Sequence, residues 1–183
     1  QNLEQRKKSL EDLVDIVGHY MREHEGDPRA CFMSGLTHYL YGESLLGKTF
    51  TQKIITEDEF HVDEKARSEF LLAIRHMKKG FALKESTAAD EGYALLMARS
   101  YYYTSFESPQ EIKSAILSSV PEESISNIED IRFFSVINIL TGQADYGIQL
   151  LTRKGIGQDD IEGSLFLAGC QKLASMYIGA IIT

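Results

Sequence analysis

Cysteine is rare in this sequence. The two cysteines, Cys31 and Cys170, lie far apart, and neither belongs to a C-x-x-C pair. This spacing excludes a disulfide framework. Both occur among apolar residues, where a free cysteine usually behaves as a small buried hydrophobe.

Basic residues are also in short supply. The chain has 19 Lys and Arg against 27 Asp and Glu, which gives a formal net charge of −8. The deficit is spread over both halves of the chain. Because such a surface repels phosphate backbones, we expect no nucleic-acid partner.

No apolar run is long enough to predict a membrane span. The most apolar segment, 165–182, is interrupted by Gln171 and Lys172, whereas a spanning helix needs about 20 nearly unbroken apolar residues. We therefore expect a buried terminal helix there. The chain begins at Gln1 rather than methionine, so we expect a processed or truncated form, and its compartment stays open.

Motifs of catalysis and metal binding are missing as well. The sequence has no G-x-S-x-G nucleophile motif and no phosphate-binding glycine loop. His19 and His24 lie five positions apart, about 140° around a helix, so they are poorly placed to bind one ion. The segment from Asp58 to Glu64 is acidic, but we expect it to cap a helix rather than bind calcium. The sequence thus predicts a protein that is not an enzyme and has no catalytic residue, metal or cofactor.

Helical periodicity dominates what is present. Apolar residues recur at three- and four-residue spacing, and no segment alternates as a strand does. With an apolar content of 43% and a charged content of 25%, one soluble domain is expected. The predicted helices cover 3–22, 28–46, 63–83, a segment from Thr87 through Tyr101, a short segment from Pro109 to before Pro121, 127–142, 143–154 and 160–181.

Small residues on two of these helices predict how they pack. Ala66, Phe70 and Ala73 form an A-x3-F-x2-A line on helix 63–83, and Gly35 forms a small notch on helix 28–46. Small residues let a neighbouring helix approach closely, and the phenylalanine fills the space between them. The order is that of a helical hairpin.

This pair of helices resembles the tetratricopeptide repeat (TPR). A degenerate second copy of the A-x3-F-x2-A line occurs at Ala144, Ile148 and Leu151. The resemblance implies an all-α fold in which antiparallel hairpins stack as a TPR-like right-handed superhelix. A single TPR-like domain over 1–183 then needs an insertion loop at about 47–62, because Gly35 and Ala66 are too far apart for one repeat. A non-repeating helical bundle is the alternative.

The resemblance also implies a function and a set of contact residues. Stacked hairpins form a concave surface that binds a peptide or partner protein, which implies a non-enzymatic interaction or scaffold module. Its first helices line that surface. The first helix of the repeat can be aligned with this sequence at Gly35 and, more loosely, at Ala94. The partner-binding candidates are then Arg29, Phe32, Tyr39, Leu40, Glu91, Ala98 and Arg99. Phe32 and Leu40 are equally well explained as core residues.

Two further possibilities stay open. The chain is alternatively a helical small-ligand-binding protein or enzyme with a site inside the bundle, where His38, His76 and Tyr93 lie in apolar-rich helical stretches. Residues 161–181 are apolar on more than one side of a helix, and a solenoid without a polar capping helix must cover its last apolar face. They therefore also predict a homo-oligomer.

Overall fold

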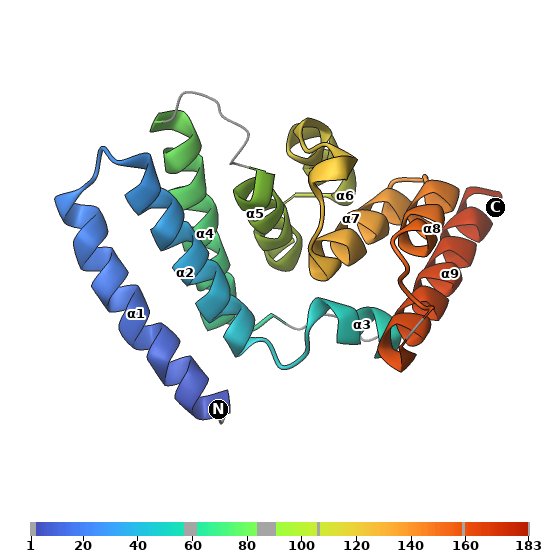
Figure 1. Ribbon diagram of the computed structural model, residues 1–183, viewed down its shortest axis with the longest axis horizontal. Coiled ribbons are helices and arrows are strands. Elements are labelled where there is room, and N and C mark those ends of the chain that lie inside the picture. The colour runs from blue at the N-terminus through green and yellow to red at the C-terminus, as the bar shows by residue number, and fades with distance from the viewer. Residues whose placement is uncertain (1–2, 57–61, 84–90, 106, 159, 183) are drawn as a thin grey trace. The chain divides into compact units, whose positions relative to one another are not determined.

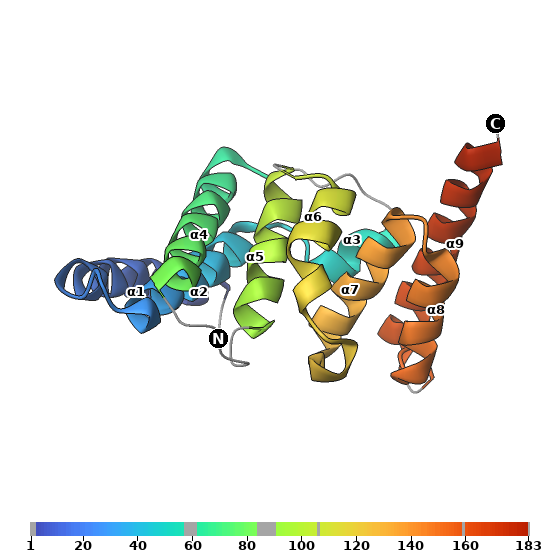
Figure 2. The same ribbon diagram turned by 90° about the horizontal axis from the view of Figure 1, so that it is seen from above.

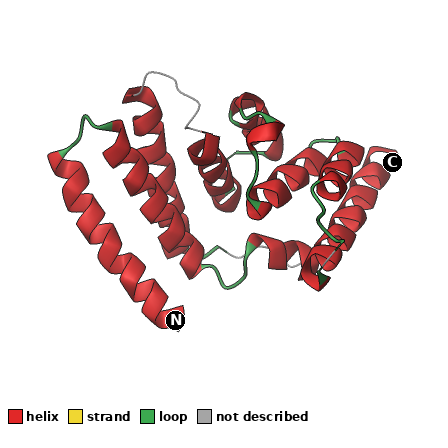
Figure 3. Cartoon of the chain, in the orientation of Figure 1, coloured by secondary structure: helices red, strands yellow, loops and turns green. Residues whose placement is uncertain are grey.

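The computed structural model describes residues 3–56, 62–83, 91–105, 107–158 and 160–182, and this part of the chain contains helices and loops but no strand (Figure 3). The all-α prediction is confirmed. The elements are α1 (Leu3–Glu23), α2 (Pro28–Leu45), α3 (Phe50–Thr56), α4 (Glu64–Leu83), α5 (Glu91–Thr104), α6 (Pro109–Ala115), the 3₁₀ turns η2 (Leu117–Ser119) and η3 (Glu122–Ser124), α7 (Ile128–Leu140), α8 (Ala144–Arg153) and α9 (Ile161–Ile182) (Figure 1).

The chain divides into two compact units. Unit 1 comprises Gln1–Gly47 and His61–Glu107, and unit 2 comprises Lys48–Phe60 and Ser108–Thr183. Each unit therefore contains two separate stretches of the chain.

Unit 1 is built on the close packing of α2 against α4, with α1 on another side of α2 and α5 beside α4. The side chains of Ala66, Phe70 and Ala73 are fully buried. A Cβ atom on Gly35 would lie only 2.6 Å from Met77 Cγ and 3.2 Å from the carbonyl oxygen of Ala73. The A-x3-F-x2-A line and the Gly35 notch thus meet at one helix crossing.

The starts of these helices follow local capping rules. The Asp27 carboxylate accepts a hydrogen bond from the Arg29 backbone N–H at 2.8 Å, and Pro28 occupies the first turn of α2. Asp63 accepts from the Ala66 backbone N–H at 2.7 Å and caps α4. The predicted start of the helical segment from Thr87 through Tyr101 lies outside the described residues.

Unit 2 has α7 at its centre, packed against both α8 and α9, as the views in Figures 1 and 2 agree. This helix is buried all round: every residue from Ile131 to Ile139 is buried, including the polar Arg132, Ser135 and Asn138. Such a helix needs neighbours on several sides. Gly142 ends α7 with φ +83°, a conformation that glycine adopts without strain.

The segment 47–62, predicted as an irregular insertion, contains helix α3, while residues 57–61 lie outside the described part. Thr49 and Gln52 form reciprocal side-chain to backbone hydrogen bonds of 3.1 and 3.2 Å at its start. Phe50 packs on Phe133 of α7 with ring centroids 5.4 Å apart. The helix therefore belongs to the core of unit 2.

Arg132 of α7 joins α3 and α9 to this core. Its Nη1 donates to Thr51 Oγ1 at 3.1 Å, to Glu129 at 2.8 Å and to Glu162 at 2.7 Å, and its side chain is only 4% exposed. The guanidinium also lies 5.2 Å from the centre of the Phe166 ring.

Both cysteines are buried and free, as predicted. Burial raises the pKa of the Cys170 thiol to about 12, which keeps it protonated and unreactive. No helix in the described ranges is long and apolar enough to cross a membrane.

Candidate functional site

A cavity of about 580 Å³ lies within unit 1, where α1, α2 and α4 meet. We call it the histidine cavity, because three histidines from three helices line it. Its lining residues are Val14, Asp15, Gly18, His19, Met21 and Arg22 of α1, Ser34 and His38 of α2, and His76 of α4.

His38 is held in one orientation by Glu69. The Nδ1 atom of His38 lies 2.7 Å from Glu69 Oε2, and both side chains are largely buried. Since a carboxylate only accepts hydrogen bonds, Nδ1 carries the proton. The other ring nitrogen, Nε2, is then left to accept a hydrogen bond from a ligand.

The His76 ring stacks on the His38 ring. Their centroids lie 5.3 Å apart, and the planes differ by 9°. Burial lowers the pKa of His76 to about 4, with smaller electrostatic contributions from His38, Arg75 and Lys79. At neutral pH the His76 ring is therefore neutral, with one nitrogen donating and one accepting.

Several polar groups of the cavity are not engaged by the protein. In the part of the chain that the structure describes, the Ser34 hydroxyl, the His19 ring and the Arg22 guanidinium have no hydrogen-bond or ion-pair partner. Ser34 is only 1% exposed. The Ser34 hydroxyl is therefore available to water or to a ligand that enters the cavity.

No metal centre is found among the described residues. His19 and His24 are both exposed, as expected, and His24 lies against the Tyr20 ring instead of beside His19. Of the acidic segment near the start of α4, Asp63 is a helix cap, while Asp58, Glu59 and His61 lie outside the described residues.

Four of the partner-binding candidates are buried. Phe32 packs against Phe81 and stacks on Tyr93, with ring centroids 5.0 and 4.5 Å apart. Ala98 is also fully buried. Phe32 is therefore a core residue. Tyr93, which stacks on it, is not among the residues that line the histidine cavity.

Tyr39 and Arg99 form a buried polar link between α2 and α5. The Tyr39 hydroxyl donates to Glu43 Oε1 at 3.0 Å and accepts from Arg99 Nη1 at 3.3 Å. Burial raises the pKa of Tyr39 well above its usual range, so the hydroxyl stays protonated and the link stays intact at any physiological pH.

The remaining candidates are accessible. Arg29 is exposed, and Leu40 and Glu91 are half-buried. On α2, Arg29 and Leu40 share one face with Met33, which is 44% exposed, and with the half-buried Leu36. We call these four residues, spaced i, i+4, i+7 and i+11, the α2 stripe.

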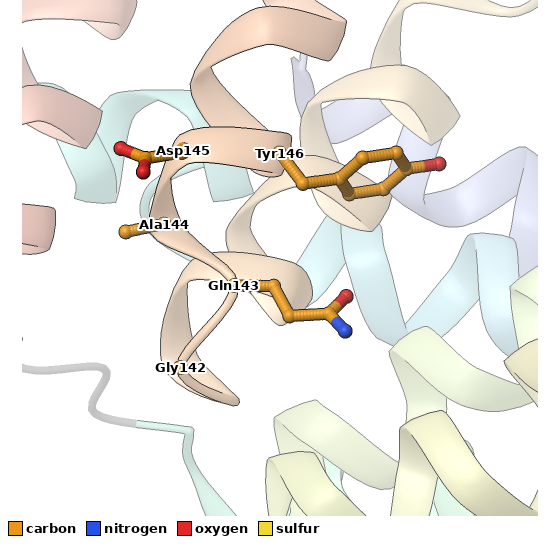
Figure 4. A pocket seen from close by; sticks show the side chains of 5 residues that line it. All are labelled: Gly142, Gln143, Ala144, Asp145 and Tyr146. Carbon is orange, nitrogen blue, oxygen red and sulfur yellow. The ribbon is translucent and has the colours of Figure 1, made fainter.

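A second hollow, of about 630 Å³, lies in unit 2 at Gly142–Tyr146 (Figure 4). Gln143 and Tyr146 extend to one side of this turn, and Asp145 extends to the other. Gln143 already accepts a hydrogen bond from Lys113, and the Tyr146 hydroxyl donates to Glu122. Because these polar groups are engaged by the protein, the hollow is the weaker candidate.

Sequence reasoning missed most of the α1 wall of the histidine cavity. Asp15, Gly18 and Arg22 recur at three- and four-residue spacing, which places them on one side of α1. This spacing could have identified the wall from the sequence. It marks a side of α1 next to the apolar side formed by Val14, Val17 and Met21.

Comparison of the chain with protein-family models, curated proteins and solved structures finds no match.

Proposed function

We propose that the protein is a non-enzymatic interaction module that binds a peptide or a partner protein along the α2 stripe. The observation that carries the proposal is the exposure of this stripe: an arginine and three apolar side chains in one line along the helix. Exposed apolar residues that are grouped rather than scattered often mark contact surfaces.

The position of the stripe agrees with a TPR-like superhelix. The side of α2 that carries Phe32 and Tyr39 faces α5. The side that carries Tyr41 faces α1, where the Tyr41 hydroxyl donates a hydrogen bond to Glu11 at 2.9 Å. The α2 stripe lies between these two sides. In stacked hairpins, this is the side of a first helix that lines the concave surface.

The chemistry of the stripe defines the partner. The Arg29 guanidinium has no ion-pair or hydrogen-bond partner among the described residues, so it is available for a carboxylate of the bound segment. Met33, Leu36 and Leu40 offer apolar contacts, and methionine adapts to partners of different shape. We therefore expect a segment with apolar side chains and an acidic or C-terminal carboxylate.

The buried candidates have a supporting role in this proposal. Tyr39 and Arg99 link α2 to α5, and Phe32 and Ala98 fill the space between helices. Glu91, at the start of α5, is accessible enough to contact the partner directly.

The test compares R29E/M33S with a matched control, R67E/L71S. Arg67 and Leu71 have the same i, i+4 spacing on α4, and Leu71 is 41% exposed. We expect proteins captured from the source lysate by the wild type and the control to be lost from R29E/M33S. The purified partner should bind R29E/M33S about tenfold more weakly or worse, because a charge-assisted bond and an apolar contact are lost.

Equal melting temperatures of the two variants would show that folding is not the cause. Equal binding of the partner by wild type and R29E/M33S would exclude the α2 stripe as the contact surface.

A further inference from the structure

The histidine cavity lies on the opposite side of α2 from the α2 stripe, since Ser34 and His38 are offset from Arg29 and Met33 around the helix. We propose that this cavity binds a small organic molecule in which an oxyanion, a carboxylate or a phosphate, is attached to a short apolar body. This site is separate from the peptide-binding surface proposed above.

Arg22 supplies the permanent positive charge. A Cβ atom added at Gly18 would lie 3.8 Å from Arg22 Nη1, which shows that the guanidinium folds back along α1 over the preceding turn. Its donors therefore lie along the cavity wall. The planar guanidinium matches the geometry of carboxylate and phosphate oxygens.

Ser34 supplies a hydroxyl donor at the buried side, one turn from His38 on α2. The two residues are 1% and 8% exposed. Glu69 fixes the orientation of the His38 ring through Nδ1. An oxyanion between Ser34 and Arg22 would accept a hydrogen bond from the Ser34 hydroxyl and a charge-assisted hydrogen bond from the Arg22 guanidinium.

The electrostatic environment at the His76 end also favours an anion. Besides burial and the neighbouring His38 ring, the groups that lower the pKa of His76 are Arg75 and Lys79, and both are cationic. The carboxylate of Glu69, also on α4, is already bound to His38. Asp15 lies on the α1 wall, but its side chain is exposed, so solvent screens its charge.

The remaining walls suit an apolar body. Val14 and Met21 line the cavity from α1, and the volume of about 580 Å³ falls in the usual range of small-molecule sites. Inorganic anions alone would leave this apolar wall unfilled, so we expect them to bind more weakly than an aromatic or aliphatic acid.

The experiment uses benzoate and phenyl phosphate as probes, with benzyl alcohol as the uncharged control. Histidine ring signals are followed by NMR during titration of the full chain. We expect saturable shifts for His19, His38 and His76, and none for His24, which lies outside the cavity. The tighter of the two acids identifies the carboxylate or the phosphate as the favoured group.

Two variants and one control test the assignment. R22Q should weaken acid binding about tenfold, because a charge-assisted hydrogen bond is lost. G18L should abolish binding by filling the cavity, and it should not unfold the helix, since leucine favours helix more than glycine does. R67Q, an exposed arginine on α4 outside the cavity, should bind as the wild type does.

Binding should also depend on pH through His76. The groups around this ring are Asp15, His19 and Arg22 on α1, His38 on α2, and Glu69, Arg75 and Lys79 on α4. A bound anion raises the low pKa of His76, so binding takes up protons and affinity should rise as the pH falls from 7 toward 5. H76Q should lose most of this pH dependence while keeping the shift of His38.

Three results would overturn the proposal: no saturable shift with either acid, equal affinity for benzyl alcohol and benzoate, or equal affinity of R22Q and R67Q. The first excludes a ligand of this class, and the other two show that the cavity does not select an anion.

Discussion

At the scale of single residues, glycine determines how closely α2 approaches α4. Gly35 lies against Met77 and Ala73, and Gly42 lies against Phe70 with distances of 3.1 to 3.2 Å from its Cβ position. Phe70 in turn contacts the rings of Tyr39 and Tyr103. The hairpin therefore depends on the absence of side chains at two positions and on one large ring between them.

Gly35→Ala should destabilise unit 1. The added methyl group overlaps the Met77 side chain and the Ala73 carbonyl, and overpacking of this kind costs about 1–3 kcal/mol of unfolding free energy. Urea unfolding followed by circular dichroism measures the change.

Gly92→Ala is the matched control. A Cβ atom at Gly92, also in a helix, meets nothing within 4 Å, so its unfolding free energy should stay unchanged or rise by up to about 1 kcal/mol. Equal effects of the two substitutions would contradict the close crossing at Gly35.

Residue patterns within one helix and the close approach of two helices at small residues were predictable, whereas the pairing of particular polar side chains across helices was not. The buried line of Ala66, Phe70 and Ala73 follows from spacing alone. The pairing of His38 with Glu69 depends on the register of two helices that are separate in sequence, and no local pattern encodes that register. The sequence identified His38 and His76 separately, and the fold brings their rings together.

At the scale of elements, local capping chemistry fixes where helices begin and end. The Ser108–Glu111 capping box, with Pro109 in the first turn, can be recognised in the sequence and is present in full. Asn127 caps α7 by accepting from the Glu129 backbone N–H at 2.8 Å. Such interactions span three residues or fewer, so the sequence reports them directly.

Helix α3 carried the same kind of signal and was missed. Thr49-x-x-Gln52 follows the capping-box pattern, but a helix of seven residues has little stability of its own. Its stability comes from Phe50 and Thr51, whose partners on α7 lie far along the chain. Tertiary contact, rather than propensity, decides this element.

Arg132→Met should loosen the attachment of α3 and α9 to α7. The substitution leaves Glu129, Glu162 and Thr51 without their common partner. Removing one member of a buried charge network typically costs about 3–5 kcal/mol, and the half-exposed acids here place the effect at the low end, about 3 kcal/mol. Hydrogen exchange should accelerate at the α3 amides first.

Arg153→Met is the comparison on the surface of the same unit. Arg153 pairs with Glu122 at 3.0 Å, but its side chain is 57% exposed. The expected loss is therefore below about 1 kcal/mol. A loss from Arg153→Met as large as that from Arg132→Met would show that burial of Arg132 is not what makes its network strong.

At the scale of the whole molecule, the two units divide the chain in a way that composition does not reveal. The sequence has no linker rich in glycine, proline or serine, and one domain over 1–183 stays its prediction. The structure assigns 48–60 and 108–183 to unit 2 and the other two stretches to unit 1. Contacts far apart in sequence define this division, so local patterns could not.

Self-association through residues 161–181 stays a prediction at this scale. Ile161, Leu165 and Met176 lie on one face of α9 and are 81%, 50% and 63% exposed. We expect the wild type to sediment as a concentration-dependent oligomer, because association would cover this apolar face. L165K/M176K should remain a monomer at the same concentrations.

L71K/L83K, which changes two apolar residues of α4 with similar exposure, serves as the control and should associate as the wild type does. A wild-type chain that stays monomeric over the whole dilution series would contradict the prediction.

The assignment of α3 to unit 2 has a consequence for synthesis of the protein. A ribosome adds about 5–20 residues per second, so α3 emerges on the order of ten seconds before α7 and α9 are complete. During that interval Phe50 and Thr51 have no core to join, while α2 and α4 can already pair around them. Translation from the N-terminus therefore lets unit 1 form first. Helix α3 stays unpacked until the helices that bury it have been synthesised.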